Sequence, residues 1–152
     1  MKTTQSNQDT VNALQDLLQK NYDAEAGYKQ VMTKTDNQPL KNWLQQKALQ
    51  RNTFATELDH QIRKHNAEPK ADGTLKGDLH RGWINIKSTL SKDTDEALLE
   101  ECIRGEKASI AEYESQLEKF NNNPEIKTIV QSQLTTVKSA LNTVKRLEDI
   151  ID

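Results

Sequence analysis

Three carboxylates and one Glu-x-x-His pair are the side chains of this chain best suited to chemistry. Glu25, Glu101 and Glu106 lie in stretches with helical periodicity, and Glu57 is followed three residues later by His60. Some helical bundles hold two divalent ions between carboxylates from two helices and Glu-x-x-His motifs from two others. The motif at Glu57 should lie about two helical turns beyond Glu25. We therefore interpret it as part of a solvated helix face.

The elements that position these residues are long helices. Apolar residues recur at intervals of three and four, which predicts one buried stripe on each helix. Asn123-Pro124-Glu125 is a helix start signal, and Asp93 with Glu96 has the spacing of a capping box. We expect helices at about 8–34, 39–66, 94–121 and 124–151, a weaker helix at about 74–90, and a disordered N-terminus at residues 1–7.

The lengths of the connections predict how the helices are arranged. Short links near residues 35–38 and 122–123 favour two antiparallel hairpins. The connection at about 67–93 is long enough to return along the whole bundle, since a helix rises about 1.5 Å per residue. The predicted fold is an all-α, ferritin-like four-helix bundle forming a single domain over residues 8–152. A simple up-and-down bundle is the alternative.

Each of the four apolar stripes is interrupted by polar residues half-way along its helix. These residues should meet at the waist of the bundle, where an unpaired carboxylate would be costly to ionise. We expect Arg51, with Lys47 or Lys138, to compensate the buried carboxylates. Cations and amides stand where further metal ligands would be needed, so no metal or cofactor is expected, and Glu25, Glu101 and Glu106 are the candidate ligands if a metal does bind. The predicted polar core network comprises Asn21, Glu25, Lys47, Arg51, Glu106, Gln133 and Lys138.

Composition argues against several classes of function. A net charge of −2, with Lys and Arg spread along the chain, argues against nucleic acid as a partner. No apolar run approaches the roughly 18 residues of a membrane span. A single cysteine, Cys102, excludes an internal disulfide and fits a reducing, cytoplasmic location. We interpret Cys102 as a small core residue rather than a nucleophile.

One segment resembles a known family. Residues 77–87 resemble the His-Arg-Gly-Trp segment of a bacterial family of ferritin-like four-helix-bundle proteins, catalogued as a domain of unknown function. Residues 23–28 and 100–106 resemble its first and third helices, and the similarity extends over about residues 9–149. The resemblance implies the ferritin-like topology with its crossover, and it implies no activity. Leu141 stands where the family often has His, which weakens a metal site carried over from relatives. The crossover residues that carry the resemblance are His80, Arg81, Gly82 and Trp83.

Two glycines inside predicted helices suggest close packing. Gly27 and Gly105 each cost about 1 kcal/mol relative to Ala in a helix interior. We expect them to leave room for a bulky side chain, with Trp83 the candidate.

These patterns predict a helical protein that works through its surface and is more readily a binding protein than an enzyme. It would act by self-association, for instance as a homodimer, or by binding a protein partner, because long amphipathic helices associate readily. The alternative is a metal-binding bundle for iron, manganese or zinc, with an oxidoreductase or storage-like role. A third hypothesis is an apolar ligand held between the helices.

Overall fold

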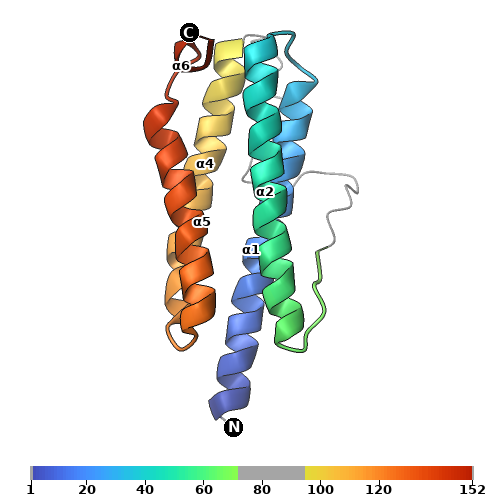
Figure 1. Ribbon diagram of the computed structural model, residues 1–152, viewed down its shortest axis with the longest axis vertical. Helices are drawn as coiled ribbons and strands as arrows, with labels where there is room; N and C mark the ends of the chain where they lie inside the picture. Colours follow the sequence, from blue (N-terminus) through green and yellow to red (C-terminus); the bar gives the residue numbers. More distant parts are fainter. Residues whose placement is uncertain (1, 72–94, 152) are drawn as a thin grey trace.

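The computed structural model describes residues 2–71 and 95–151, and this part of the chain is helical with no strand. The all-helical bundle expected from the sequence is confirmed. Figure 1 shows the long helices standing side by side, with a short C-terminal helix at one end of the bundle. The elements are α1 (Lys2–Met32), α2 (Gln38–Lys64), α4 (Asp95–Leu117), η1 (Glu118–Phe120), α5 (Pro124–Thr143) and α6 (Glu148–Ile151).

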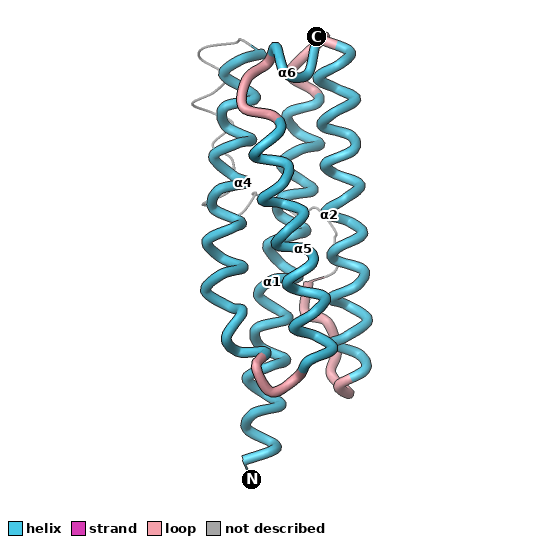
Figure 2. Tube along the Cα trace, turned by 60° about the vertical axis from the view of Figure 1, so that its left-hand side comes forward, coloured by secondary structure: helices cyan, strands magenta, loops and turns pink. Residues whose placement is uncertain are grey.

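Contacts at the two ends of the bundle fix the direction of each helix. The Thr35 hydroxyl, in the turn before α2, contacts the Asp95 carboxylate at the start of α4 at 2.5 Å. At the other end, His65, after α2, lies 3.1 Å from the amide of Asn123, which precedes α5. The helices α2 and α4 therefore run in the same direction, and the chain between them joins opposite ends of the bundle (Figures 1 and 2). This is the crossover topology that the long middle connection predicted.

Side-chain caps start two of the helices as the sequence indicated. The Asn37 side chain accepts a hydrogen bond of 2.9 Å from the Leu40 amide, and Asn123 accepts one of 3.1 Å from Ile126. A proline occupies the first turn of α2 and of α5, where its missing N–H costs nothing. Asp93, the proposed cap of the third helix, lies outside the described residues, as do Trp83 and the helix expected at 74–90.

The N-terminal prediction is wrong. Residues 1–7 were expected to be disordered, but α1 begins at Lys2. No proline or glycine precedes Gly27, so nothing in the sequence stops the helix from extending toward its N-terminus. The Gln8 and Asn12 side chains, one turn apart, also bond to each other at 2.9 Å, a pairing that supports helical structure.

The fourth predicted helix, 124–151, is also wrong in its last part. The helix α5 ends at Thr143, and Val144 adopts an extended conformation. Asp149 then accepts hydrogen bonds from the amides of Lys145 and Arg146, while the Leu147 amide donates to Glu96 on α4. The apolar spacing continued past the true helix end because the residues after the break still pack on the core; these are Val144, Leu147 and Ile150.

The core consists of two apolar clusters that a polar layer separates. One cluster lies toward the α4–α5 turn and includes Leu14, Leu58 and Phe120. The other lies toward the α1–α2 turn and includes Leu40 and Leu99. Gly27 and Gly105 are both buried. In the described part of the chain, every helix is too short or too polar to cross a membrane.

Candidate functional site: the polar layer of the bundle

A fully buried ion pair joins two helices across the centre of the bundle. Arg51 is the middle residue of α2, and Glu106 is the middle residue of α4. The two side chains are 0% and 2% exposed, and Arg51 Nη2 lies 2.9 Å from Glu106 Oε1. The helices α2 and α4 are diagonal in the bundle, so only long side chains such as these can meet on its axis.

The electrostatics of the pair keep the Arg51 guanidinium charged. Burial alone would lower the pKa of Arg51, but the charge and hydrogen bond of Glu106, together with the effects of Tyr28 and Tyr113, outweigh burial and raise that pKa above its usual value. The Tyr28 hydroxyl donates a hydrogen bond to the same oxygen of Glu106. Burial, and then the Glu106 charge, raise the pKa of Tyr28 well above its ordinary value, so its phenol is neutral. Glu106 Oε1 thus accepts from one cation and one phenol.

On its other side, Arg51 begins a chain of hydrogen bonds in which each group donates to the next. Arg51 Nη1 donates to Asn21 Oδ1 at 3.0 Å, and Asn21 Nδ2 donates to the Tyr113 hydroxyl at 2.8 Å. Tyr113 in turn donates to Gln133 Oε1 at 2.6 Å. Gln133 Nε2 donates to Glu57 Oε1 at 2.8 Å. The chain runs from a cation to an anion through all four long helices, and such polarised chains strengthen their members cooperatively.

The direction of this chain also fixes the state of Tyr113. Its oxygen accepts from Asn21 while its proton goes to Gln133, so it must remain a neutral phenol. Burial raises the pKa of Tyr113 to about 12, in spite of the opposing effect of Arg51. The amide orientations of Asn21 and Gln133 follow from the same order of donors and acceptors.

Several residues predicted for the polar network lie outside it. Glu25 is 14% exposed and pairs with Lys29 at 2.9 Å, with Asn52 donating to it as well. Lys138 is half-exposed and pairs with Glu114. Both were expected at the waist, but the helices turn these positions toward the surface, where solvent and i, i+4 or neighbouring-helix partners neutralise them.

Lys47 is buried near the waist without an ion-pair partner within 4 Å among the described residues. Its ammonium lies 5.5 Å from the centre of the Trp43 ring, a cation–π contact. Burial lowers the pKa of Lys47, the effect of the nearby Arg51 adds to this, and Glu106 opposes both. The indole therefore provides part of the compensation that the sequence had assigned to a carboxylate.

The carboxylates proposed as metal ligands do not converge. Glu101 pairs with Arg104 at 2.8 Å, and Glu25 bonds toward α2 at the bundle surface. Within residues 2–71 and 95–151, no three His, Cys, Asp or Glu side chains form a group able to hold a metal ion. At the centre, Glu106 is bound to a permanent guanidinium cation, which would repel a divalent ion. The donor set does not fit the dinuclear site of ferritin-like bundles.

Sequence reasoning missed three members of the network: Tyr28, Tyr113 and Glu57. The two tyrosines looked like apolar stripe residues, but each lies seven residues after a buried polar residue on its own helix, Asn21 or Glu106. A phenol two turns from a buried polar group is placed to supply a hydrogen bond, and this spacing was the available signal. Glu57 is exposed, as the solvated-face interpretation held, yet one of its oxygens reaches Gln133.

The remaining chemistry-bearing side chains are arranged for structure. Cys102 is fully buried, and burial raises its thiol pKa far above the ordinary value, which confirms it as a core residue. His60 is exposed. The crossover residues His80, Arg81, Gly82 and Trp83 lie outside the described part of the chain.

The fold and this site together define a ferritin-like helical bundle with an ion pair on its axis. The structure of a mutant of Mycobacterium smegmatis Dps1 matches it with a TM-score of 0.73. The match covers 89% of this chain and 91% of that one at 14% sequence identity, so it establishes the shared fold alone. A search of curated proteins gives no match. The chain belongs to the family described as Domain of unknown function (DUF2383), whose model matches residues 9–119.

Proposed function

We propose that this protein acts by self-association through its surface rather than by catalysis. The observation that supports the proposal is the way the central polar groups bind one another. Arg51 and Glu106 neutralise each other, and the amides and phenols around them are arranged as consecutive donors and acceptors. A centre built in this way holds the helices in register, and it leaves binding to the outer faces. The single, buried cysteine suits a cytoplasmic setting, which we include in the proposal.

A metal-binding bundle is the second candidate, and the ferritin-like fold favours it. Fold does not determine function, however, and the site must supply the ligands. Glu106 Oε2 is buried and accepts no hydrogen bond from the described residues, so this one carboxylate oxygen could serve as a metal ligand. One carboxylate oxygen beside a guanidinium is too little to hold two divalent ions.

One experiment separates the two candidates. Untagged full-length protein is measured by sedimentation velocity across the micromolar to millimolar range, and its metal content is counted by mass spectrometry after anaerobic addition of ferrous iron. We expect the mass to rise with concentration and the metal to stay at background. Near-integer metal per chain, lost in Glu106→Gln, would establish the second candidate instead. A monomer at every concentration would overturn self-association.

A further inference from the structure

The chain after α5 folds back onto the bundle as a short separate segment. We call residues 144–151 the C-terminal strap. It begins at Val144, whose backbone is extended with φ −123° and ψ 106°, and it includes the short helix α6. Figure 1 shows it at the end of the bundle where α5 ends. Its apolar residues Val144, Leu147 and Ile150 pack against the apolar cluster at the α1–α2 turn.

The strap is weakly attached to the rest of the protein. Its three apolar residues are all only partly buried. In the described part of the chain, one hydrogen bond joins the strap to another helix, from the Leu147 amide to Glu96 on α4 at 3.1 Å. Asp149 accepts two others from the amides of Lys145 and Arg146, and these lie within the strap itself. Segments with so few buried contacts are the ones that open locally before the whole protein unfolds.

A groove lies between the strap and α2. Trp43 and Gln46 line it on the α2 side, and Val144 and Ile150 line it on the strap side. The groove is open and has a volume of about 380 Å³. The strap therefore covers the end of α2 without filling the space against it, which agrees with its weak attachment.

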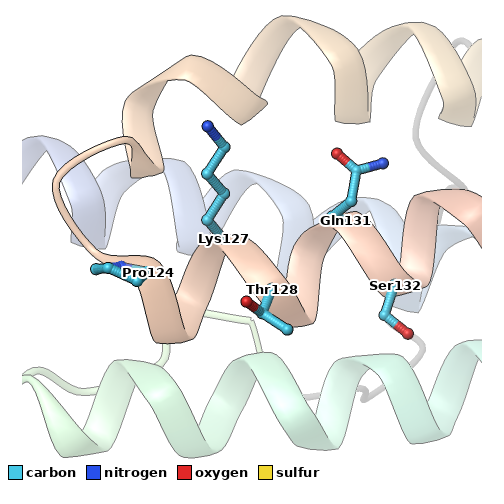
Figure 3. Close-up of a pocket in the computed structure, with 5 residues that line it drawn as sticks. All are labelled: Pro124, Lys127, Thr128, Gln131 and Ser132. Atoms are coloured by element: carbon cyan, nitrogen blue, oxygen red, sulfur yellow. The ribbon is translucent and has the colours of Figure 1, made fainter.

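A second open groove, of about 470 Å³, differs from this one. Figure 3 shows the side chains that line it, from Pro124 to Ser132, and all of them belong to α5. No other segment of the described chain lines this groove, so nothing indicates what would bind there. At the end of the bundle, by contrast, the structure shows a segment that fits, which is the strap itself.

The sequence allows the strap a second conformation. No proline or glycine lies between Glu125 and Asp152, and the apolar spacing of α5 continues into the strap, a pattern that predicts helix. In a continued helix, the amides of Lys145, Arg146 and Leu147 would bond to the carbonyls four residues before them. These bonds replace the ones that Asp149 and Glu96 provide in the closed strap. The backbone at residues 144–146 can therefore change conformation without leaving amides unsatisfied.

We propose that two copies of this chain exchange their C-terminal straps, which deepens the self-association proposed above and rests on it. In the open form α5 continues as a helix through residues 144–146, which act as the hinge. Leu147 and Ile150 then leave their own bundle. A second copy presents the same docking surface, so the strap makes between two chains the apolar contacts that it makes within one. Exchange of an identical element is a low-cost route to a dimer.

The exchange also sets how strongly the copies associate. Each bundle loses one strap and gains an identical one, so the apolar contacts of Leu147 and Ile150 cancel between monomer and dimer. The strap of the same chain competes for the docking surface at an effective concentration on the order of millimolar, as short links give. We therefore expect a reversible dimer with a dissociation constant of about 1 mM.

The first test locks the strap onto its own bundle. Full-length protein carries Gln46→Cys and Ile150→Cys, two positions that line the same groove. A short bis-maleimide joins the two thiols at low micromolar protein, where the chain is monomeric, while Cys102 is protected by its burial. The matched control is the same double variant with both thiols capped by N-ethylmaleimide. Its weaker strap contact is the same within one chain and between two.

Sedimentation velocity up to millimolar protein then gives the result. We expect the capped control to dimerise and the locked protein to remain a monomer. A locked protein that dimerises as well as the control would overturn strap exchange, while self-association through another surface stands. A wild-type protein that is monomeric throughout would overturn both proposals.

A second variant should strengthen the dimer, a gain that contact between two rigid surfaces does not predict. Asp149→Ala removes the side chain that holds the closed hinge. A cap of this kind changes an equilibrium constant about fivefold, and two hinges open in each dimer, so the association constant should rise about 25-fold. Asp59→Ala, the control, removes an acid that pairs with Arg63 on α2 and should change it less than about twofold. Circular dichroism verifies that all variants are folded. Unchanged or weaker dimerisation of Asp149→Ala would overturn the exchange.

Discussion

Removing one member of the buried ion pair should destabilise the protein more than any single surface change. Replacing Glu106 with Gln keeps the shape of the side chain but leaves the Arg51 guanidinium charged at 0% exposure. Breaking a buried pair in this way costs about 3–5 kcal/mol. A chain of this length loses about 2–4 °C of melting temperature per kcal/mol, so Tm should fall by about 6–20 °C.

The matched control is Glu114→Gln, which removes the exposed partner of Lys138. Surface pairs contribute about 0–1 kcal/mol, so this variant should melt within about 4 °C of the wild type. Both free energies of unfolding are measured by urea denaturation followed by far-ultraviolet circular dichroism. The loss in unfolding free energy of Glu106→Gln is then divided by that of Glu114→Gln, and this ratio, rather than either value alone, reports the effect of burial.

A double-mutant cycle completes the test. Arg51→Met with Glu106→Leu removes both charges, and apolar replacement of a buried pair is often neutral in itself. Here it also deprives Asn21 and Tyr28 of their partners, at about 1–3 kcal/mol for each unsatisfied group. The double variant should therefore recover only part of the loss. Two results would refute a buried ion pair at the centre of the bundle. One is that the losses in unfolding free energy of the two single variants add up to that of the double variant. The other is that Glu106→Gln lowers the unfolding free energy by less than about 1 kcal/mol.

Three further predictions follow from the same layer. With the pKa of Tyr113 raised to about 12, against about 10 when unfolded, its phenol contributes about 3 kcal/mol that is present below pH 10 and lost as pH rises through about 12. The unfolding free energy of Tyr113→Phe, measured with urea, should therefore lack this loss at alkaline pH. Equal pH profiles for the variant and the wild type would contradict the prediction. Glu57→Gln should lower the unfolding free energy by about 1 kcal/mol, because it weakens the hydrogen bond from Gln133. The same loss in a protein that already carries Gln133→Leu would show that this hydrogen bond contributes nothing. The Cys102 thiol should react with a soluble thiol reagent only at the rate of unfolding, and fast labelling in native buffer would disprove its burial.

The helices and their order could be predicted because their causes are local. Proline positions, asparagine caps and apolar spacing act within one helix, and they placed the start of α2 and of α5 within one residue. The parallel arrangement of α2 and α4 followed from chain length alone. Where the same local rules failed, as after Thr143, tertiary contacts decided: the Asp149 cap and the Glu96 bond to the Leu147 amide turn the chain onto the core.

The site was predicted less well because it depends on how each helix is rotated about its axis. Sequence spacing groups Glu25 with Asn21 on one stripe, yet positions four residues apart differ by about 40° around the helix, and this difference exposes part of Glu25 while Asn21 stays inside. The same spacing cannot distinguish a tyrosine that contributes only its ring from one whose hydroxyl bridges two helices. The spacing did predict Arg51, Glu106 and Gln133, because a charged or amide side chain in the middle of a long apolar stripe must point into the core.

The polar layer also fixes how the helices are placed relative to one another. Each of the four helices supplies at least one member of the hydrogen-bond chain, so a shift of one helix by one turn, about 5.4 Å, would break the chain in two places. Gln133 on α5 bonds both to Glu57 and to the backbone carbonyl of Phe54 on α2. These two bonds set the spacing of α2 and α5. A specific core layer therefore keeps the four helices in one register, and with it the shape of the outer surface that a partner would contact.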